Sequence, residues 1–394
     1  MFKLILAFAL LVLPLCAGDL SGRWSATLSS NGRDVPLHLE FRQQGQEVAG
    51  AFGKRADFMS PLGKLHLAGS ALTFELQIPM GPAARFEGVV DGDRASGQLT
   101  SDAPGLSGKL EMKRTGPPSR LPASFDAAAK SNDLAALSDE FDNPGTLRNW
   151  KSLSDAEGWP NRVEKVDANT TSAGHLYVVP QSGAWWAGYH GVYFFKEVRG
   201  DFAITTRVKV TGKSGGEPAT MWTLSGLLVR APADAKIPRE QRKENWIYLM
   251  TGRGPEGGRV IDAKSTLGSD NAWDITPARP GWYELRIARV GPLFIAMCRP
   301  DGGDWMLRKR IVREDLPETL QAGINVTSDF LLSASMPAAK YNAELFPGAS
   351  RPDSVTMFDF VRFSRPAGTP ELKSKLAGQE VVDVNDADLL ALFR

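Results

Sequence analysis

The sequence is poor in cysteine and histidine, from which disulfides and many metal centres are built. Its 394 residues include two cysteines and four histidines. Cys16 lies in an N-terminal segment with the features of a cleavable leader, so after cleavage Cys298 is alone and no intrachain disulfide forms. Cys298 ends the apolar run 293–298, which predicts a buried thiol rather than a nucleophile. We predict no metal ligands and no cofactor.

An excess of charge of either sign is also missing. Lysine and arginine total 46 and aspartate and glutamate 45, for a formal net charge of +1. Proteins that bind nucleic acids need a basic surplus to neutralise phosphates, so we predict no nucleic-acid partner. No apolar run reaches the roughly 20 residues that a membrane-spanning helix needs. We therefore predict no transmembrane anchor.

Strong catalytic motifs are scarce as well. The sequence contains neither His-Glu-x-x-His nor Cys-x-x-Cys. Residues 212–216 match the Gly-x-Ser-x-Gly pattern, but Glu217 and Pro218 follow where a nucleophile elbow needs a helix, so we predict a loop. His38 and His66 lack a third zinc ligand, and we interpret them as surface or pocket-lining residues.

Residues 1–18 have the pattern of an export signal. Lys3 supplies the positive charge, 4–15 are apolar, and small residues follow at Ala17 and Gly18. This predicts a secreted or periplasmic protein. Lipidation of Cys16 stays an alternative, although Leu15 is bulky for a lipoprotein signal.

Residues 19–115 predict a small all-β domain. Short segments with period-2 alternation recur between polar turns, as expected for an antiparallel barrel or meander. We expect eight strands, at 23–28, 36–41, 48–52, 64–67, 72–78, 85–90, 95–100 and 106–113. The count and the Gly22-Arg23-Trp24 start loosely resemble a lipocalin-like β-meander module.

Two connecting segments have a different composition. Residues 116–136 contain Pro117, Pro118 and Pro122 followed by alanines, which predicts a semi-rigid linker with a short helix. Residues 367–394 form a tail whose end predicts a short helix capped near Asn385. This helix would either dock on its own protein, which we favour, or bind a partner.

Residues 137–366 predict a larger strand-rich domain. Nine of the ten tryptophans lie at or after Trp150. The segments 138–142, 225–230 with 244–249, 283–289 with 300–305, and 322–324 with 357–361 resemble, in this order, the concanavalin A-like lectin/glucanase superfamily, in particular an uncharacterised bacterial branch. The resemblance implies a jelly-roll β-sandwich and a carbohydrate ligand.

The sequence departs from the superfamily's catalytic pattern. Laminarinase-type members carry Glu-x-Asp-x-x-Glu on one strand. Glu140 and Asp142 begin this string, but Gly145 stands in place of the second glutamate. We therefore expect a structural role for Glu140 and Asp142.

Alternation in three strands predicts a polar and aromatic surface. Successive side chains of a strand point to opposite faces of its sheet. In 225–230, 245–249 and 283–287 one alternate set is apolar and suits the core. If these strands are neighbours, the other set shares one face and offers rings and hydrogen-bonding groups to sugars. The candidates are Arg230, Trp246, Tyr248, Glu284 and Arg286. For Trp246 and Tyr248 the alternative is packing between the sheet and its loops.

The aromatic segment 185–190 is a candidate rim for this surface. Trp186, Tyr189 and His190 complete the predicted ligand-binding set, whereas packing is the favoured role of Trp185. The segment 270–274 is a weak candidate calcium loop, because Asp270 and Asp274 alone provide too few oxygen ligands.

The leading hypothesis is an exported, two-domain, all-β protein that binds a polysaccharide or oligosaccharide without cleaving it. One alternative is a glycoside hydrolase or lyase with Glu284 as the acid/base. The other is a structural or adhesion protein that binds protein partners.

Overall fold

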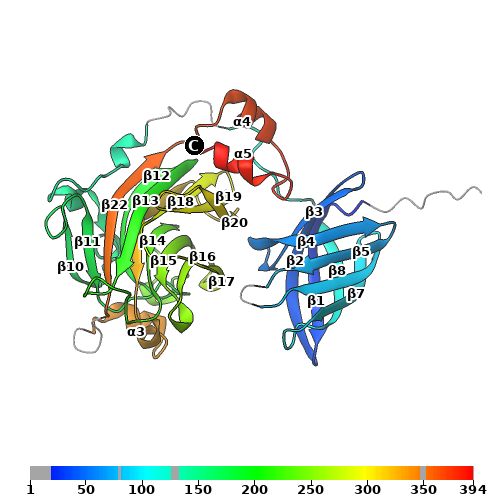
Figure 1. Cartoon of the computed structure of the whole chain (residues 1–394), viewed down its shortest axis with the longest axis horizontal. Helices are drawn as coiled ribbons and strands as arrows, with labels where there is room; N and C mark the ends of the chain where they lie inside the picture. The colour runs from blue at the N-terminus through cyan, green and yellow to red at the C-terminus, as the bar shows by residue number, and fades with distance from the viewer. Residues whose placement is uncertain (1–18, 79–80, 126–132, 347–351, 394) are drawn as a thin grey trace, which may run out of the picture. The chain divides into compact units, whose positions relative to one another are not determined.

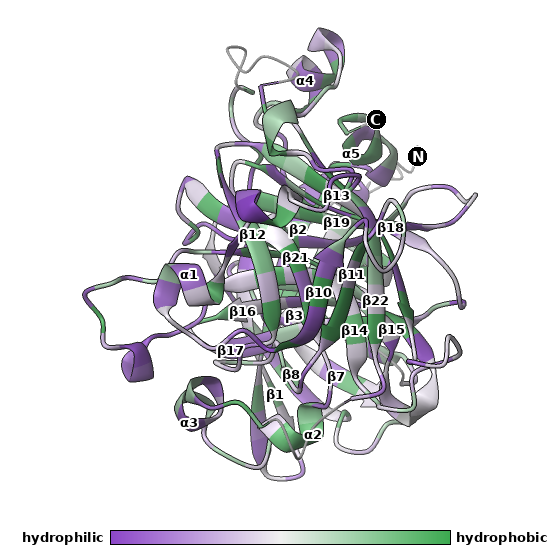
Figure 2. Cartoon of the chain, turned by 90° about the vertical axis from the view of Figure 1, so that its left-hand side faces the viewer, coloured by the Kyte–Doolittle hydropathy of each residue, from purple (hydrophilic) through white to green (hydrophobic). Residues whose placement is uncertain are grey.

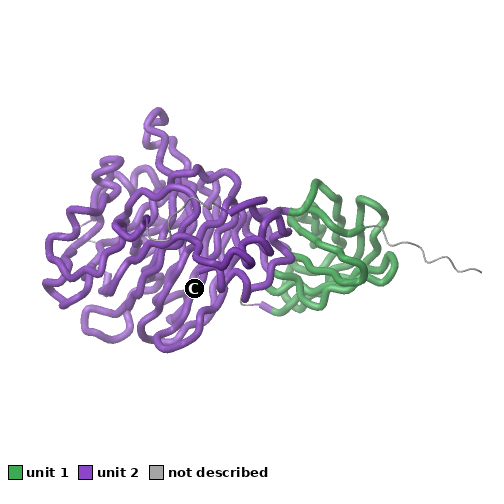
Figure 3. The backbone as a smooth tube through the Cα atoms, turned by 90° about the horizontal axis from the view of Figure 1, so that it is seen from above, with its two compact units in different colours: residues 1–51, 61–78, 82–118 green, residues 52–60, 79–81, 119–394 purple. Residues whose placement is uncertain are grey.

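The computed structural model describes residues 19–78, 81–125, 133–346 and 352–393. The export signal predicted at 1–18 and most of the linker helix, predicted around 127–130, lie outside the described residues. The chain divides into two compact units (Figure 3). Unit 1 comprises 1–51, 61–78 and 82–118, and unit 2 comprises 52–60, 79–81 and 119–394.

Eight antiparallel strands close into the barrel of unit 1, apart from residues 52–55 and 58–60 at the ends of two of them, which belong to unit 2 (Figure 1). Each strand pairs with its sequence neighbours, and pairing of the first strand with the eighth closes the barrel. The strands are β1 (Gly22–Ser30), β2 (Arg33–Gln44), β3 (Glu47–Arg55), β4 (Phe58–Ala68), β5 (Ala71–Leu76), β6 (Ala84–Asp91), β7 (Arg94–Ser101) and β8 (Gly108–Gly116). The predicted eight-stranded antiparallel barrel is confirmed.

Aromatic side chains fill the interior of the barrel. Alternate residues of β1 are buried, as the period of two requires. Phe74 and Phe86 stack with ring centroids 4.6 Å apart, and Trp24 meets Phe41 edge to face. The interior of unit 1 is thus a packed core of the kind found in small barrels.

Two antiparallel sheets form the body of unit 2. We call the first the front sheet, with strand order β17-β16-β15-β14-β21-β12-β9. Its strands are β9 (Lys151–Ser152), β12 (Val192–Arg199), β14 (Thr223–Arg230), β15 (Trp246–Arg253), β16 (Arg259–Leu267), β17 (Asp270–Pro277) and β21 (Thr319–Thr327).

We call the second the back sheet, whose unit 2 strands run β10-β11-β22-β13-β18-β19-β20. They are β10 (Val163–Ala168), β11 (Leu176–Pro180), β13 (Phe202–Thr211), β18 (Tyr283–Val290), β19 (Leu293–Pro300), β20 (Met306–Val312) and β22 (Val355–Ser364).

The main core of unit 2 lies between these sheets. Leu227 and Ile247 of the front sheet share one buried cluster with Ile204 and Leu285 of the back sheet. Several strands are accordingly coloured largely hydrophobic, whereas β10 at the edge of the back sheet is largely hydrophilic (Figure 2). Together with the barrel, this β-sandwich confirms the predicted all-β fold class.

The C-terminal tail packs on the outer face of the back sheet. It contains α4 (Pro370–Leu376) and α5 (Asp386–Ala391), and α5 lies beside β20 (Figure 1). Leu389, Leu392 and Phe393 are buried in one cluster with Ile295 of β19. Asn385 caps α5 by accepting a hydrogen bond from the Asp388 amide. The tail helix docks on its own chain, as we favoured.

The remaining helices are short. They are η1 (Ala135–Leu137), η2 (Thr146–Asn149), α1 (Leu153–Glu157), η3 (Arg239–Gln241), η4 (Pro255–Gly257), α2 (Phe330–Ser333) and α3 (Ala338–Ala343). Within the described part of the chain, no helix has the length and apolar character needed to span a membrane.

Candidate functional site

A row of side chains crosses four strands on the outer face of the front sheet. Strand pairing sets Glu197 of β12 opposite Gln321 of β21, Gln321 opposite Arg230 of β14, and Arg230 opposite Trp246 of β15. Residues directly opposite in adjacent strands point to the same face. The row therefore passes from an exposed carboxylate to a buried indole.

Arg230 is the centre of a buried ion-pair network. Its guanidinium donates to both oxygens of Glu244, at 2.6 and 2.8 Å, and also to Glu157. Gln321 Oε1 accepts a further bond at 3.0 Å. The Arg230 residue is 1% exposed. A guanidinium at this depth is stable only because carboxylates and an amide satisfy its donors.

The network favours the charged forms of Arg230 and Glu244. Burial alone would raise the pKa of Glu244, but the charges of Arg230 and His190 hold it well below its ordinary value. Burial likewise opposes the charge of Arg230, yet Glu244 and Glu157 raise its pKa. His190 Nε2 lies 3.0 Å from Glu244 Oε1, the oxygen that also accepts from Arg230 Nη2.

Local capping positions Glu157 at the end of α1. Ser152 and Asp155 form a reciprocal capping box at its N-terminus. Gly158 ends the helix in the left-handed conformation with φ 72°, which glycine adopts without strain. Glu157 also accepts hydrogen bonds from Trp159 Nε1 at 3.2 Å and from Arg242 at 3.4 Å.

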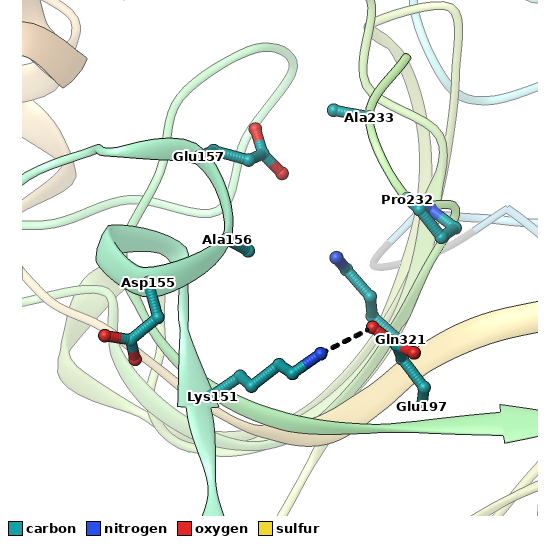
Figure 4. A pocket seen from close by; sticks show the side chains of 8 residues that line it. All are labelled: Lys151, Asp155, Ala156, Glu157, Glu197, Pro232, Ala233 and Gln321. Atoms are coloured by element: carbon teal, nitrogen blue, oxygen red, sulfur yellow. Dashed lines mark hydrogen bonds and ion pairs between the residues drawn. The ribbon is translucent and has the colours of Figure 1, made fainter. Parts of the chain in front are cut away.

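A cavity of about 310 Å³ opens beside this network (Figure 4). We call it the front pocket. The Lys151–Glu197 ion pair, at 3.0 Å, forms one side, and Glu157 lies on the other. Its lining consists of Lys151, Asp155, Ala156, Glu157, Glu197, Pro232, Ala233 and Gln321.

The front pocket offers polar groups in fixed positions. Gln321 Oε1 accepts from Arg230, so its amide nitrogen is directed away from that bond and into the cavity (Figure 4). Glu197 and Lys151 supply an acceptor and a donor. Pro232 and Ala233 give the wall its apolar part. Such a mixture suits a small polyhydroxylated molecule.

The expected open aromatic groove is wrong for this face. Trp246 is 0% and Tyr248 1% exposed, although both lie opposite the sandwich core, as strand alternation predicts. Their rings stack 5.2 Å apart, and Trp185 meets Trp246 at right angles. Covering segments have turned this face into a second core, which alternation within a strand cannot reveal.

The predicted rim residues belong to this cover. Trp186 packs edge to face on Phe330 of α2, and Tyr189 packs on Tyr341 of α3. His190 is buried against Glu244. Trp185 is buried, so the packing role favoured for it is confirmed.

Glu284 and Arg286 lie on a different sheet from the other candidates. Their strand, β18, belongs to the back sheet, whereas β14 and β15 belong to the front sheet. The condition that all three strands are neighbours holds for β14 and β15 and fails for β18, because sheet order depends on pairings between distant segments. The two residues face the outside of the back sheet and line a second cavity of about 430 Å³, which we call the back pocket.

A buried polar cluster on the front sheet consists of Tyr248, Asp262 and Lys264. The Tyr248 hydroxyl donates to Asp262 Oδ2 at 2.7 Å, and Lys264 donates to Tyr248. Burial raises the pKa of Asp262 and lowers that of Lys264, so desolvation outweighs their mutual attraction. All three residues are at most 3% exposed, which makes them part of the packed face.

The minor predictions have mixed outcomes. The segment 270–274 is part of strand β17 instead of a calcium loop, and Asp274 pairs with Lys309. Among the described residues, no group of three or more His, Cys, Asp or Glu is placed to hold a metal ion. Cys298 is buried, as predicted, and burial raises its pKa to about 11. Residues 212–216 form a loop, which is also confirmed.

Sequence reasoning missed most of the front pocket. Lys151, Glu157, Glu197 and Gln321 were not among the candidates, because they come from segments distant in sequence. One local signal was present: the capping box and terminal glycine of 152–158 predict a short helix that ends at Glu157.

Comparison with known proteins gives distant similarities of fold. No protein-family model and no curated protein matches the sequence significantly. A xylan β-1,4-xylosidase from Bacillus halodurans C-125 superposes with TM-score 0.41 and 11% identity over 84% of this chain and 63% of that chain. SCLam, a non-specific endo-β-1,3(4)-glucanase of family GH16, gives TM-score 0.36 and 12% identity over 63% and 94%.

A protein of unknown function from Saccharomyces cerevisiae gives TM-score 0.39 and 13% identity over 56% of this chain and 99% of that chain. Two of these three structures are glycoside hydrolases. At such low TM-scores and identities we draw no functional conclusion from them.

Proposed function

We propose that the chain is an exported carbohydrate-binding protein and that the front pocket holds a sugar unit of a polysaccharide or oligosaccharide. The observation that carries this is the rigid polar wall of the pocket. Glu157 and Gln321 are both fixed by the buried Arg230. Recognition of hydroxyl groups depends on donors and acceptors held in place before the ligand arrives.

The pocket has the size and composition for one sugar ring. Its volume of about 310 Å³ is at the lower end of the range for small-molecule sites. Glu157 and Glu197 act as acceptors, and Lys151 and Gln321 act as donors. Both carboxylates are engaged by cations, an arrangement that suits hydrogen-bond acceptors for hydroxyls and binding without cleavage.

The test is retention of the full chain on a panel of insoluble polysaccharides, followed by titration with oligosaccharides of the one that retains it. Gln321→Ala and Glu197→Gln should weaken binding about five- to tenfold, the effect of losing one or two hydrogen bonds. Glu318→Gln is the matched control, because Glu318, like Glu197, is an exposed glutamate in an ion pair, with Arg199 at the end of β12 as its partner. Equal binding by all three variants would refute the assignment, as would retention by no glycan.

Glycoside cleavage is the second candidate function. It is motivated by the back pocket, where Glu140 and Glu284 line one cavity. Each carboxylate is bound by an arginine, Glu140 by Arg362 and Glu284 by Arg299. The chain would then release reducing ends from a glycan that it binds, and Glu284→Gln would abolish that release. Release that survives this substitution excludes Glu284 as the acid/base.

A further inference from the structure

The back pocket is built across four adjacent strands of the back sheet. Thr205 of β13 pairs with Arg286 of β18 on one side and with Arg362 of β22 on the other. Glu284 of β18 lies opposite Arg299 of β19. Three guanidinium groups and the carboxylates of Glu284 and Glu140 therefore share a cavity of about 430 Å³.

Two of the three guanidiniums already have carboxylate partners. Arg362 binds both oxygens of Glu140, at 2.8 and 2.7 Å. Arg299 binds Glu284 at 2.7 Å. Each of these two ion pairs has no net charge, so the net charge of the described lining comes from the third arginine.

Arg286 is that third arginine, and its hydrogen bonds go to neutral groups. Nε donates to the Thr205 hydroxyl at 2.8 Å, and Nη1 donates to the Phe393 carbonyl. No carboxylate among the described residues forms an ion pair with it. Burial lowers the pKa of Arg286 to about 10, after the opposing charge of Glu284 and the smaller lowering effect of Arg299 are included. The guanidinium stays charged at neutral pH, so the described lining has one uncompensated positive charge.

Trp305 fixes the direction of two of these groups. Arg286 and Arg299 lie over its ring at 4.4 and 4.8 Å from the centroid. A guanidinium stacked on an aromatic ring keeps its N–H edge free to bind a planar anion. The stack therefore presents donors to the cavity at low entropic cost.

We propose that the back pocket binds a sugar-sized molecule with one carboxylate, such as a uronic acid, with the carboxylate on Arg286. A planar monoanion matches the excess charge, and Arg286 Nη2 carries donors that Thr205 and Phe393 do not use. A dianion is disfavoured by the nearby Glu140 and Glu284, which can instead accept bonds from ligand hydroxyls. The volume leaves room for a ring beyond the carboxylate. This site is separate from the front pocket and does not depend on the function proposed there.

The test is calorimetric titration of the full chain with glucuronate and galacturonate, and separately with glucose, galactose and inorganic phosphate. We expect a uronate to bind and Arg286→Gln to weaken it at least about tenfold, because a charge-assisted bond is lost. Arg207→Gln is the matched control, since Arg207 lies on the same strand as Thr205 and pairs with Asp359 and Asp301. It should bind as the parent does.

Arg362→Gln provides a second variant if Arg286→Gln does not fold, because the Arg362 side chain is 56% exposed. It should weaken uronate binding without changing the melting temperature by more than a few degrees. Binding of neither uronate, equal binding of the neutral sugars, tighter binding of phosphate, or an equal loss in Arg207→Gln would each overturn the proposal.

Discussion

The outer faces of the two sheets of unit 2 are both covered, but by different parts of the chain. On the front sheet, Trp246 is covered by Trp185 and other aromatic residues of unit 2 loops and strands. On the back sheet, the C-terminal tail brings Leu392 and Phe393 onto β19. A polar pocket lies on each of these faces. Strand alternation thus predicts which side chains point away from the sandwich core. Whether those side chains are exposed to solvent depends on the segments that cover the sheet.

Replacing Trp246 separates packing from ligand binding on the front face. We expect Trp246→Ala to lower the free energy of unfolding by about 3–5 kcal/mol, the usual cost of removing a buried aromatic side chain. Denaturant titration measures this. Trp273→Ala is the control, since Trp273 is 42% exposed, and it should cost much less. If Trp246→Ala keeps full stability but no longer binds glycan, the result would support the open aromatic groove and contradict the packing role of Trp246.

Removing Arg230 tests whether the front pocket rests on a buried network. Arg230→Met leaves the carboxylates of Glu157 and Glu244 without their main partner, and we expect a loss of about 3–5 kcal/mol. The double variant with Glu244→Gln should recover part of that loss, because one unpaired charge is then gone. A double-mutant cycle by denaturant unfolding measures the coupling. Strict additivity of the two losses would contradict the network.

The tail should contribute less per residue than the front aromatics. Leu392 is 0% exposed, so Leu392→Ala should lower the free energy of unfolding by about 2–4 kcal/mol. Leu331→Ala is the matched control, because Leu331 is 66% exposed and should change stability only slightly. Equal effects of the two variants would mean that the tail does not dock in solution.

A pH series gives the finest distinction. The folded pKa of Glu244 lies below its ordinary value of 4.5, so the carboxylate stabilises the fold at pH above 4.5. That contribution is lost as pH falls through the folded pKa. The stability gap between the parent and Glu244→Gln should therefore be largest near neutral pH and shrink below pH 4.5. A stability difference that increases below pH 4.5 would contradict the lowered pKa of Glu244 in the folded protein.

Much of the fold follows from local sequence pattern. Alternation and turn spacing predict the eight strands of the barrel, and the same alternation puts Arg230 and Trp246 on one face. Capping residues mark the short helices at 152–158 and 385–391. These features depend on neighbours a few residues apart, which a single sequence contains.

The site depends on contacts that no local pattern encodes. Glu197, Gln321 and Arg230 meet because β12, β21 and β14 pair in a particular order and register. Glu284 was assigned to the same groove because its strand has the same alternation, although it lies in the other sheet. The burial of Trp246 depends on segment 185–190, more than 50 residues away in sequence.

Hydrogen exchange of the full chain with and without a saturating oligosaccharide tests the central claim most directly. A ligand in the front pocket should slow exchange in segment 151–157 and at the Ala233 amide and leave 246–249 unchanged, because the latter are already buried and hydrogen-bonded within the sheet. Protection confined to 246–249, with none at 151–157, would contradict the claim that the outer face of the front sheet is covered and that the ligand binds in the front pocket.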